Sequence, residues 1–314
     1  MARRITRYKY APQITETDAG VGVSRWFDAA QNDQPELLLI GGLRSTPQSL
    51  HGLQAELYSR GINSTMIDAT RAHSLRHQLT VTAERYAQLV QTTLRDVSPD
   101  IAQGAPYDCM GHSQGGVVAQ QVAYHDGNLE KLILNASVPG AALRPMDAAT
   151  AIIMGSPYRS EADAGAIYGG VIRQDPALAK IFGLLQESPT AQDHETYRQQ
   201  VSVFLQAPEL IERFVQLRND TLLISDRDDP IVPPENSEIM EKLLLIRNGV
   251  LHLRNIGAAA CNLTTVLANI PIPQQPIDRV PSVKMVYTEG LGHMGPIVSP
   301  TQTADILEPF LRRS

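Results

Sequence analysis

The stretch that decides the fold is Tyr107-Asp-Cys-Met-Gly-His-Ser113-Gln-Gly-Gly-Val-Val-Ala-Gln-Gln-Val-Ala-Tyr124. Residues 107–110 are typical of a short strand, and residues 114–124 carry apolar side chains at helical spacing. Between them, Gly111-His-Ser-Gln-Gly115 fits the pattern G-x-S-x-G, in which a sharp turn between a strand and a helix exposes a serine hydroxyl. The N-terminal end of the helix favours negative charge that develops beside it. The stretch therefore predicts a nucleophilic Ser113, with an incidental serine in a glycine-rich turn as the alternative.

Strands and helices alternate on both sides of this turn, which is the pattern of an α/β protein with a mostly parallel central sheet flanked by helices. The run Glu36-Leu-Leu-Leu-Ile40 ends at Gly41-Gly42, as expected for a strand buried on both faces. The other predicted strands are 64–68, 107–110, 131–135, 221–224 and 283–287, the predicted helices are 75–94, 114–124 and 301–311, and a lead-in hairpin is predicted at 7–10 and 23–27.

Two segments interrupt the alternation. Between 140 and 219, helix-like segments are broken by prolines and by Gly169-Gly170, which predicts a mostly helical cap inserted into a core domain formed by 1–139 and 220–314. Between 249 and 281, four prolines surround short apolar runs. We interpret this second segment as an unusual insertion before the last strand, and its apolar and proline content prompts the hypothesis of a role in self-association.

A serine hydroxyl is a poor nucleophile at neutral pH and needs a base. Of the eight histidines, His293 lies in Glu289-Gly-Leu-Gly-His293-Met-Gly, a glycine-rich loop directly after the last predicted strand. Such a loop can return an imidazole to the carboxyl edge of the sheet, so His293 is the predicted base, with a solvated loop histidine as the alternative. His112 adjoins Ser113 in sequence, and we expect its side chain to point elsewhere, in a packing or pocket-wall role.

An imidazole base needs a carboxylate to orient it. The segment Leu223-Ile-Ser-Asp-Arg-Asp-Asp-Pro-Ile-Val-Pro233 offers Asp226, Asp228 and Asp229 at the end of a predicted strand. Asp229 is the predicted acid because it immediately precedes Pro-Ile-Val-Pro, where a fixed turn can hold it toward the histidine. Asp228 stays open as an alternative, followed by Asp226 and by a solvated turn. The resulting chain order of Ser, Asp and His differs from the orders of the chymotrypsin and subtilisin arrangements.

Acyl transfer also needs N–H donors where negative charge develops on the carbonyl oxygen. The predicted oxyanion donors are the N–H of Gln114, which follows the nucleophile, and that of Leu43, in the loop after the first long parallel strand. The alternative is that Gly41-Gly42 merely permits a tight turn. The residues predicted to contact the substrate are Gly42, His112, Met294 and Tyr168.

The composition excludes several classes of protein. Hydrophobic residues make up 43% and charged residues 19% of the chain, which is globular rather than disordered. A net charge of -6 argues against a nucleic-acid partner. No apolar run resembles a transmembrane segment or a signal peptide, so we expect a soluble, cytoplasmic protein. We expect no structural disulfide between Cys109 and Cys261, and no metal or cofactor, since HExxH, paired CxxC, GxGxxG and P-loop motifs are absent from the sequence.

These motifs resemble the α/β-hydrolase superfamily over nearly the whole chain. Leu38-Leu-Ile-Gly-Gly-Leu43 is similar to that family's strand and oxyanion loop, although many members have His where Gly41 stands. The nucleophile elbow, the acid loop and the histidine loop of the family are similar to residues 111–116, 226–233 and 292–294. The family commonly has Gly where Asp226 stands, which places its catalytic acid on Asp229. The resemblance implies a serine hydrolase with an α/β-hydrolase fold.

A narrower resemblance is to intracellular medium-chain polyhydroxyalkanoate depolymerases. Residues 116–123, Met154-Gly-Ser-Pro-Tyr158 and Ile167-Tyr-Gly-Gly-Val-Ile-Arg-Gln-Asp-Pro176 are similar to that group's helix after the elbow and to its cap. The chain departs from the pattern in its spacing of 64 positions from Asp229 to His293, where the family usually has about half as many. The extra segment could be a subunit interface, a second lid or a regulatory flap.

Together, the sequence predicts a carboxylic ester hydrolase that cleaves an ester of a medium-sized apolar acyl group through an acyl-enzyme. In this mechanism, Ser113 attacks, His293 shuttles the proton and Asp229 fixes the imidazole tautomer. The same residues leave open a thioesterase, a lactonase or a carbon–carbon bond hydrolase, and a non-catalytic binding member of the fold. The expected partner is a small-molecule or oligomeric ester, and the insertion at 249–281 would mediate a homo-oligomer.

Overall fold

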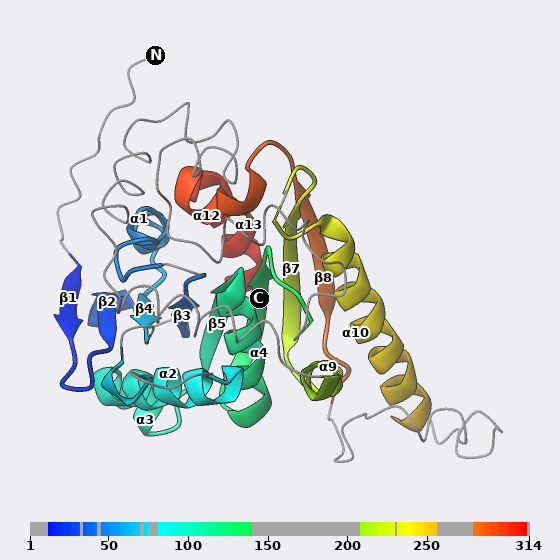
Figure 1. Ribbon diagram of the computed structural model, residues 1–314, viewed down its shortest axis with the longest axis horizontal. Coiled ribbons are helices and arrows are strands. Elements are labelled where there is room, and N and C mark those ends of the chain that lie inside the picture. Colours follow the sequence, from blue (N-terminus) through cyan, green and yellow to red (C-terminus); the bar gives the residue numbers. More distant parts are fainter. Residues whose placement is uncertain are drawn as a thin grey trace.

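The computed structural model describes residues 12–31, 34–42, 45–69, 72–75, 81–139, 208–229, 231–255 and 279–312. In these residues, eight strands form one sheet in the order β1-β2-β4-β3-β5-β6-β7-β8 (Figure 1). The strands are β1 (Gln13–Glu16), β2 (Gly22–Trp26), β3 (Glu36–Ile40), β4 (Ser64–Asp68), β5 (Tyr107–His112), β6 (Leu129–Asn135), β7 (Asp220–Asp226) and β8 (Val283–Thr288). The helices are α1 (His51–Ser59), α2 (Ala83–Val97), α3 (Pro99–Ala102), α4 (Gln114–His125), α9 (Pro208–Phe214), α10 (Pro234–Asn255), α12 (Gly295–Val298) and α13 (Pro300–Leu311), with short 3-10 turns η1 (Ala29–Gln31), η2 (His73–Leu75) and η3 (Gly292–Met294).

The strands from β3 to β8 run parallel, and β1 and β2 add an antiparallel edge. In the middle of the sheet, Cys109 of β5 lies opposite Leu38 of β3 on one side and Leu132 of β6 on the other. Parallel strands bring all their carboxyl ends to one edge of the sheet, where ligands of such folds bind. The loops that follow β3, β5, β7 and β8 therefore meet at this edge.

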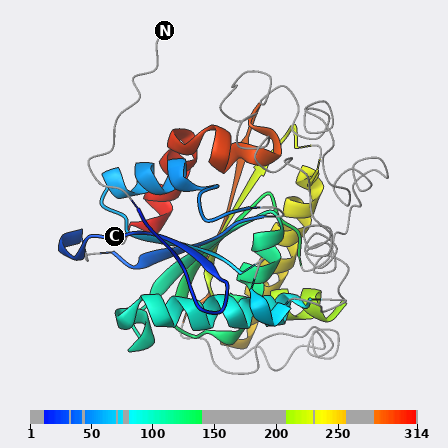
Figure 2. The ribbon, with the colours of Figure 1, turned by 60° about the vertical axis from the view of Figure 1, so that its left-hand side comes forward.

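The two faces of the sheet bury separate hydrophobic clusters. Because side chains alternate along a strand, Leu38 and Ile40 of β3 pack with α2, α4 and α10 on one face, whereas Leu37 and Leu39 pack with α1 and α13 on the other. Figure 2 shows α1 and the C-terminal helices on one side of the sheet and α2 on the opposite side. A strand buried on both faces explains why residues 36–40 are apolar almost throughout.

The predicted fold class, a mostly parallel central sheet flanked by helices, is confirmed. Strands β3 and β4 have the predicted bounds, and the other predicted strands extend by one to three residues. An antiparallel lead-in pair is present, but the strand that pairs with β2 is β1 at Gln13–Glu16 and not the predicted 7–10. The two strands are joined by a turn in which Gly20 has a φ of 74° and donates its N–H to Thr17 O at 2.8 Å. The first predicted arm, 7–10, lies outside the described residues.

The predicted cap and insertion fall largely outside the described residues. Of the cap, 140–219, the structure describes residues from 208 onward, which include α9. Helix α10 continues to Asn255 and thus passes through the start of the segment 249–281, and residues 256–278 are outside the description. The cap fold and the role of this insertion in self-association stay predictions.

Within the described part of the chain, no helix combines the length and apolar character that a membrane span requires. The cytoplasmic location stays a prediction. Cys109 is buried in β5 as a free thiol, and Cys261 lies outside the described residues.

We predict that Leu38→Ala destabilises the fold by about 2–5 kcal/mol, because Leu38 is fully buried in the central sheet and its truncation leaves a cavity. The matched control is Leu245→Ala on α10, where the side chain is 51% exposed and truncation should change the free energy of unfolding by about 0.5 kcal/mol or less. Urea unfolding monitored by circular dichroism measures both. Equal effects of the two substitutions would contradict this description of the core.

Candidate active site

Ser113 occupies a strained turn between β5 and α4. Its φ is 54° and its ψ is -124°, a backbone conformation that L-residues rarely adopt and that costs about 1–3 kcal/mol. The turn is possible because a side chain is absent on either side of it. A Cβ at Gly111 would overlap the backbone of Gly115 and Gly116, and a Cβ at Gly115 would overlap the carbonyl of Ile40. The glycines of the motif therefore let β5, α4 and β3 approach closely enough to expose Ser113 at the carboxyl edge.

His293 lies in η3, in the loop directly after β8, and both of its ring nitrogens are engaged. Nε2 is 2.8 Å from Ser113 Oγ, and Nδ1 is 2.9 Å from Asp229 Oδ2. Because an ionised carboxylate only accepts hydrogen bonds, Nδ1 carries the proton and Nε2 accepts from the serine hydroxyl. All three residues are buried, with exposed fractions of 3–5%. The structure thus brings Ser113, Asp229 and His293 together from three separate loops.

Asp229 is held by the turn that the sequence Pro-Ile-Val-Pro predicts. Its Oδ1 accepts the N–H of Ile231 at 2.8 Å and that of Val232 at 2.9 Å, which leaves Oδ2 for the imidazole. A carboxylate that accepts three hydrogen bonds is fixed in direction.

The two other acids of this loop contact the backbone of the histidine loop instead of the imidazole. Asp226 accepts from the Thr288 hydroxyl at 2.9 Å and from the Leu291 N–H at 3.0 Å. Asp228 accepts from the Gly290 N–H at 3.2 Å. Asp228, the alternative catalytic acid, is therefore directed to Gly290, and Asp229 is the acid that meets His293.

His112 packs beside the base, and Asn135 holds it there. The ring of His112 lies 5.1 Å from that of His293, and its Nδ1 is 2.7 Å from Asn135 Oδ1. Burial, together with the neighbouring His293, lowers the pKa of His112 to about 3, so the ring is neutral near pH 7. Sequence reasoning missed Asn135, although a polar residue that ends an apolar strand at the carboxyl edge is a usable signal.

The loop after β3 reaches the nucleophile at Gly42. A Cβ at this position would lie 2.9 Å from Ser113 Cβ, so the contact needs a glycine. Gln114, one predicted oxyanion donor, is the first residue of α4 and is buried beside Ser113. Leu43, the other predicted donor, and Tyr168 lie outside the described residues. Met294 is buried next to His293 in η3, and its contact with a substrate stays a prediction.

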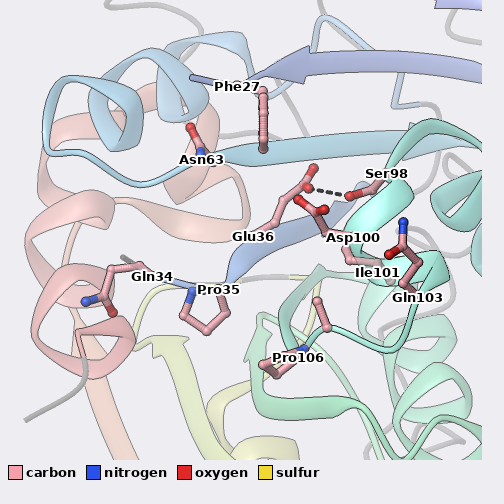
Figure 3. A pocket seen from close by; sticks show the side chains of 11 residues that line it. Phe27, Gln34, Pro35, Glu36, Asn63, Ser98, Asp100, Ile101, Gln103 and Pro106 are labelled. Atoms are coloured by element: carbon pink, nitrogen blue, oxygen red, sulfur yellow. Dashed lines mark hydrogen bonds between the residues drawn. The ribbon is translucent and has the colours of Figure 1, made fainter. Parts of the chain in front are cut away.

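A cavity of about 420 Å³ lies at the opposite edge of the sheet, among the amino ends of β3, β4 and β5 (Figure 3). Glu36 in its wall accepts from Ser98 Oγ at 2.7 Å and from Arg25 Nη2 at 3.1 Å. Strand β5 runs the width of the sheet from this cavity to Ser113, roughly 20 Å at strand geometry. The cavity is thus separate from the three residues at the carboxyl edge.

A mostly parallel sheet that carries a serine on the turn after one strand, followed in the chain by an aspartate and a histidine on later loops, defines the α/β-hydrolase fold. The sequence profile of the Alpha/beta hydrolase family matches residues 37–306, and the chain therefore belongs to the α/β-hydrolase family. No curated protein matches it in sequence.

Several solved structures share the fold at low sequence identity. The chain is similar to the meta-cleavage product hydrolase of Pseudomonas fluorescens IP01, with a TM-score of 0.65, 15% identity and coverage of 95% of this chain and 96% of that one. It is also similar to a serine hydrolase of Cycloclasticus zankles, with a TM-score of 0.64, 15% identity and coverage of 96% of this chain and 98% of that one. A thioesterase domain from the curacin biosynthetic pathway has a TM-score of 0.60 and 13% identity, with coverage of 95% of this chain and 98% of that one.

In the described residues, no group of three or more His, Cys, Asp or Glu side chains gathers as metal ligands would. The expectation of no metal and no cofactor stays a prediction.

We predict that His112→Asn makes stability less sensitive to acid. The pKa of His112 is lowered from 6.5 to about 3, so between these values the unfolded chain binds more protons than the folded one. The free energy of unfolding therefore decreases as pH falls from 6.5, by up to about 1.4 kcal/mol per pH unit for this group. Urea unfolding from pH 7 to pH 4 should give a shallower slope for the variant. Equal slopes would argue against a neutral, buried His112.

Proposed function

We propose that this protein is a serine hydrolase that cleaves an ester of a medium-sized apolar acyl group through an acyl-enzyme. The observation that carries the proposal is the continuous set of hydrogen bonds from Asp229 through His293 to Ser113, at 2.9 Å and 2.8 Å. This geometry suits a base that removes a proton from a nucleophile while a carboxylate stabilises the resulting imidazolium.

The first half of the reaction acylates the serine. Ser113 Oγ attacks the carbonyl carbon of the ester, and its proton passes to His293 Nε2 over the 2.8 Å hydrogen bond. The carbonyl electrons move to the oxygen, which the N–H groups of Gln114 and Leu43 would stabilise, each donor contributing about 3 kcal/mol. The tetrahedral intermediate then collapses, the alcohol leaves with the proton from His293, and the acyl group stays on Ser113.

The second half releases the acid. His293 takes a proton from a water molecule, whose oxygen attacks the acyl carbon, and the same oxyanion donors stabilise the second intermediate. Collapse breaks the bond to Ser113 Oγ, which recovers its proton from His293. Throughout, Asp229 holds the proton on Nδ1 so that Nε2 faces the serine, and it offsets the positive charge of the imidazolium.

The choice of acyl group rests on resemblance. The segments Met154–Tyr158 and Ile167–Pro176 are similar to the cap of medium-chain polyhydroxyalkanoate depolymerases. A cap of this kind would supply an apolar acyl pocket, to which Tyr168 would contribute. Gly42, His112 and Met294 would line the pocket beside the nucleophile, and the substrate would be a small or oligomeric ester.

A different bond cleaved by the same three residues is the second candidate function. Two of the structural neighbours are described as a thioesterase domain and a meta-cleavage product hydrolase. A thioester, a lactone or a carbon–carbon bond next to a carbonyl could accept the same attack. A non-catalytic binding role is the third candidate, and it is disfavoured by the aligned hydrogen bonds of Ser113 and His293.

We predict that Ser113→Ala or His293→Ala lowers kcat by about 10⁵- to 10⁶-fold and that Asp229→Asn lowers it by about 10⁴-fold, because the last substitution leaves the imidazole in the wrong tautomer. The matched control is Ser24→Ala, which removes another serine–histidine hydrogen bond of 2.8 Å, to His51, far from the elbow in sequence. Its kcat should stay within about twofold of wild type. Near wild-type turnover by Ser113→Ala would overturn the proposed mechanism.

A substrate series tests the bond and the chain length. With p-nitrophenyl esters of two to twelve carbons, we expect kcat/KM to peak at medium length, and to exceed the values for matched thioesters and lactones. A peak at the acetyl ester would contradict the medium-sized pocket. Faster cleavage of thioesters or lactones than of every ester would favour the second candidate function instead.

A further inference from the structure

Asp226 is a buried carboxylate that the proposed reaction does not use. It ends β7, it is 3% exposed, and it lies opposite Thr288, the last residue of β8. Its Oδ1 accepts the N–H of Asp228 at 2.9 Å, and its Oδ2 accepts both the Thr288 hydroxyl at 2.9 Å and the N–H of Leu291 at 3.0 Å. One side chain thus shapes the loop that carries Asp229 and also binds the loop that carries His293.

The histidine loop depends on such hydrogen bonds because no side chain packs at two of its positions. Gly290 and Gly292 have φ values of 74° and 55°, and a Cβ at either would meet no atom within 4 Å. Two glycines with left-handed backbone and no side chain give this segment many accessible conformations. Leu291 lies between them, and its N–H is the one that Asp226 binds. The bond therefore restrains the loop two residues before His293.

The other contacts between the two loops are more exposed. Asp228 binds Gly290 N–H at 3.2 Å near the surface, and the ion pair of Arg227 with Glu289 spans 3.6 Å between side chains that are 59% and 79% exposed. Exposed pairs of this kind contribute little, because water competes for the same groups. The backbone bond from Arg227 N–H to Thr288 O, at 3.0 Å, fixes the loop at its start but not at Leu291.

We propose that Asp226 is a positioning residue that sets the place of the His293 imidazole relative to Ser113, by binding Leu291 N–H and the Thr288 hydroxyl. The proposal rests on the proposed function and deepens it. A displacement of the imidazole by about 1 Å can lower the rate a hundredfold. Loss of the Asp226 hydrogen bonds should therefore lower kcat.

The test is Asp226→Asn, whose amide offers a single acceptor oxygen and turns an N–H₂ group toward the other donors. We expect kcat to fall by about 10- to 100-fold with KM within about twofold. The low-field proton resonance of His293 Nδ1–H, which reports the bond to Asp229, should shift or broaden. This resonance needs no substrate, so it tests the role of Asp226 even if the protein proves to have no esterase activity. Absent turnover in the wild-type protein would instead overturn the proposed function.

The matched control is Asp220→Asn at the opposite end of β7. Asp220 binds the N–H and the hydroxyl of Ser282 at 2.7 Å and 2.9 Å, so it joins the same two segments far from His293. This variant should lower stability while kcat and the low-field resonance stay as in wild type. If Asp226→Asn behaves in the same way, Asp226 is a structural residue and the proposal is overturned.

If Asp226→Asn does not fold, Thr288→Val carries the test. It removes one donor to Asp226 and keeps the side-chain shape, and kcat should fall by about 3- to 10-fold with KM unchanged, because the carboxylate is then less well fixed at Leu291. Thr288→Ser, which keeps the hydroxyl, should restore the rate. Wild-type kcat and a wild-type resonance in Thr288→Val would overturn the proposal.

Discussion

The candidate site depends first on the backbone of Ser113, which has a φ of 54°. This conformation presents the hydroxyl above the sheet, but it is maintained only because α4 can begin directly against β3. Gly115 touches the carbonyl of Ile40, and Gly42 lies against Ser113 itself. Any side chain at these glycines would separate the strand, the turn and the helix. Two hydrophobic clusters, one on each face of the sheet, hold these elements together and so support the strained turn.

The base and its acid reach the nucleophile as one connected unit. Strands β7 and β8 pair in parallel up to Asp226 and Thr288, and the loops that follow them stay joined through the side chains of Asp226 and Asp228. Asp229 then extends from this unit to His293 at 2.9 Å. Asp226 and Asp228 thus bind the segment that carries His293, and Asp229 binds the imidazole itself. A neutral His112 beside the base adds no competing charge.

Much of this arrangement could be predicted from the sequence, because local patterns determine it. The apolar run 36–40 and the strand, turn and helix around Ser113 have local signatures in the sequence, and the residues predicted to act together do lie within hydrogen-bonding distance. The position of Asn135 at the end of an apolar strand is a signal in the sequence, but the hydrogen-bond partners of Asn135 and Asp226 could not be predicted. They follow from the strand register that sets His112 opposite Asn135 and Asp226 opposite Thr288. Helix α10 was not among the predicted helices, and the insertion predicted from 249 onward begins inside it, because Gly249 sits in the helix with open space where its Cβ would be.

The most direct measurement of the central claim, that Ser113 is an activated nucleophile, is its reaction with a fluorophosphonate. The full chain would be incubated with the reagent, digested and analysed by mass spectrometry, with Ser113→Ala in parallel. The account predicts a single adduct on the peptide that contains Ser113 and none in the variant, because the bond to His293 makes this serine far more reactive than the others. An unlabelled wild-type protein, or an adduct that persists in Ser113→Ala, would contradict it.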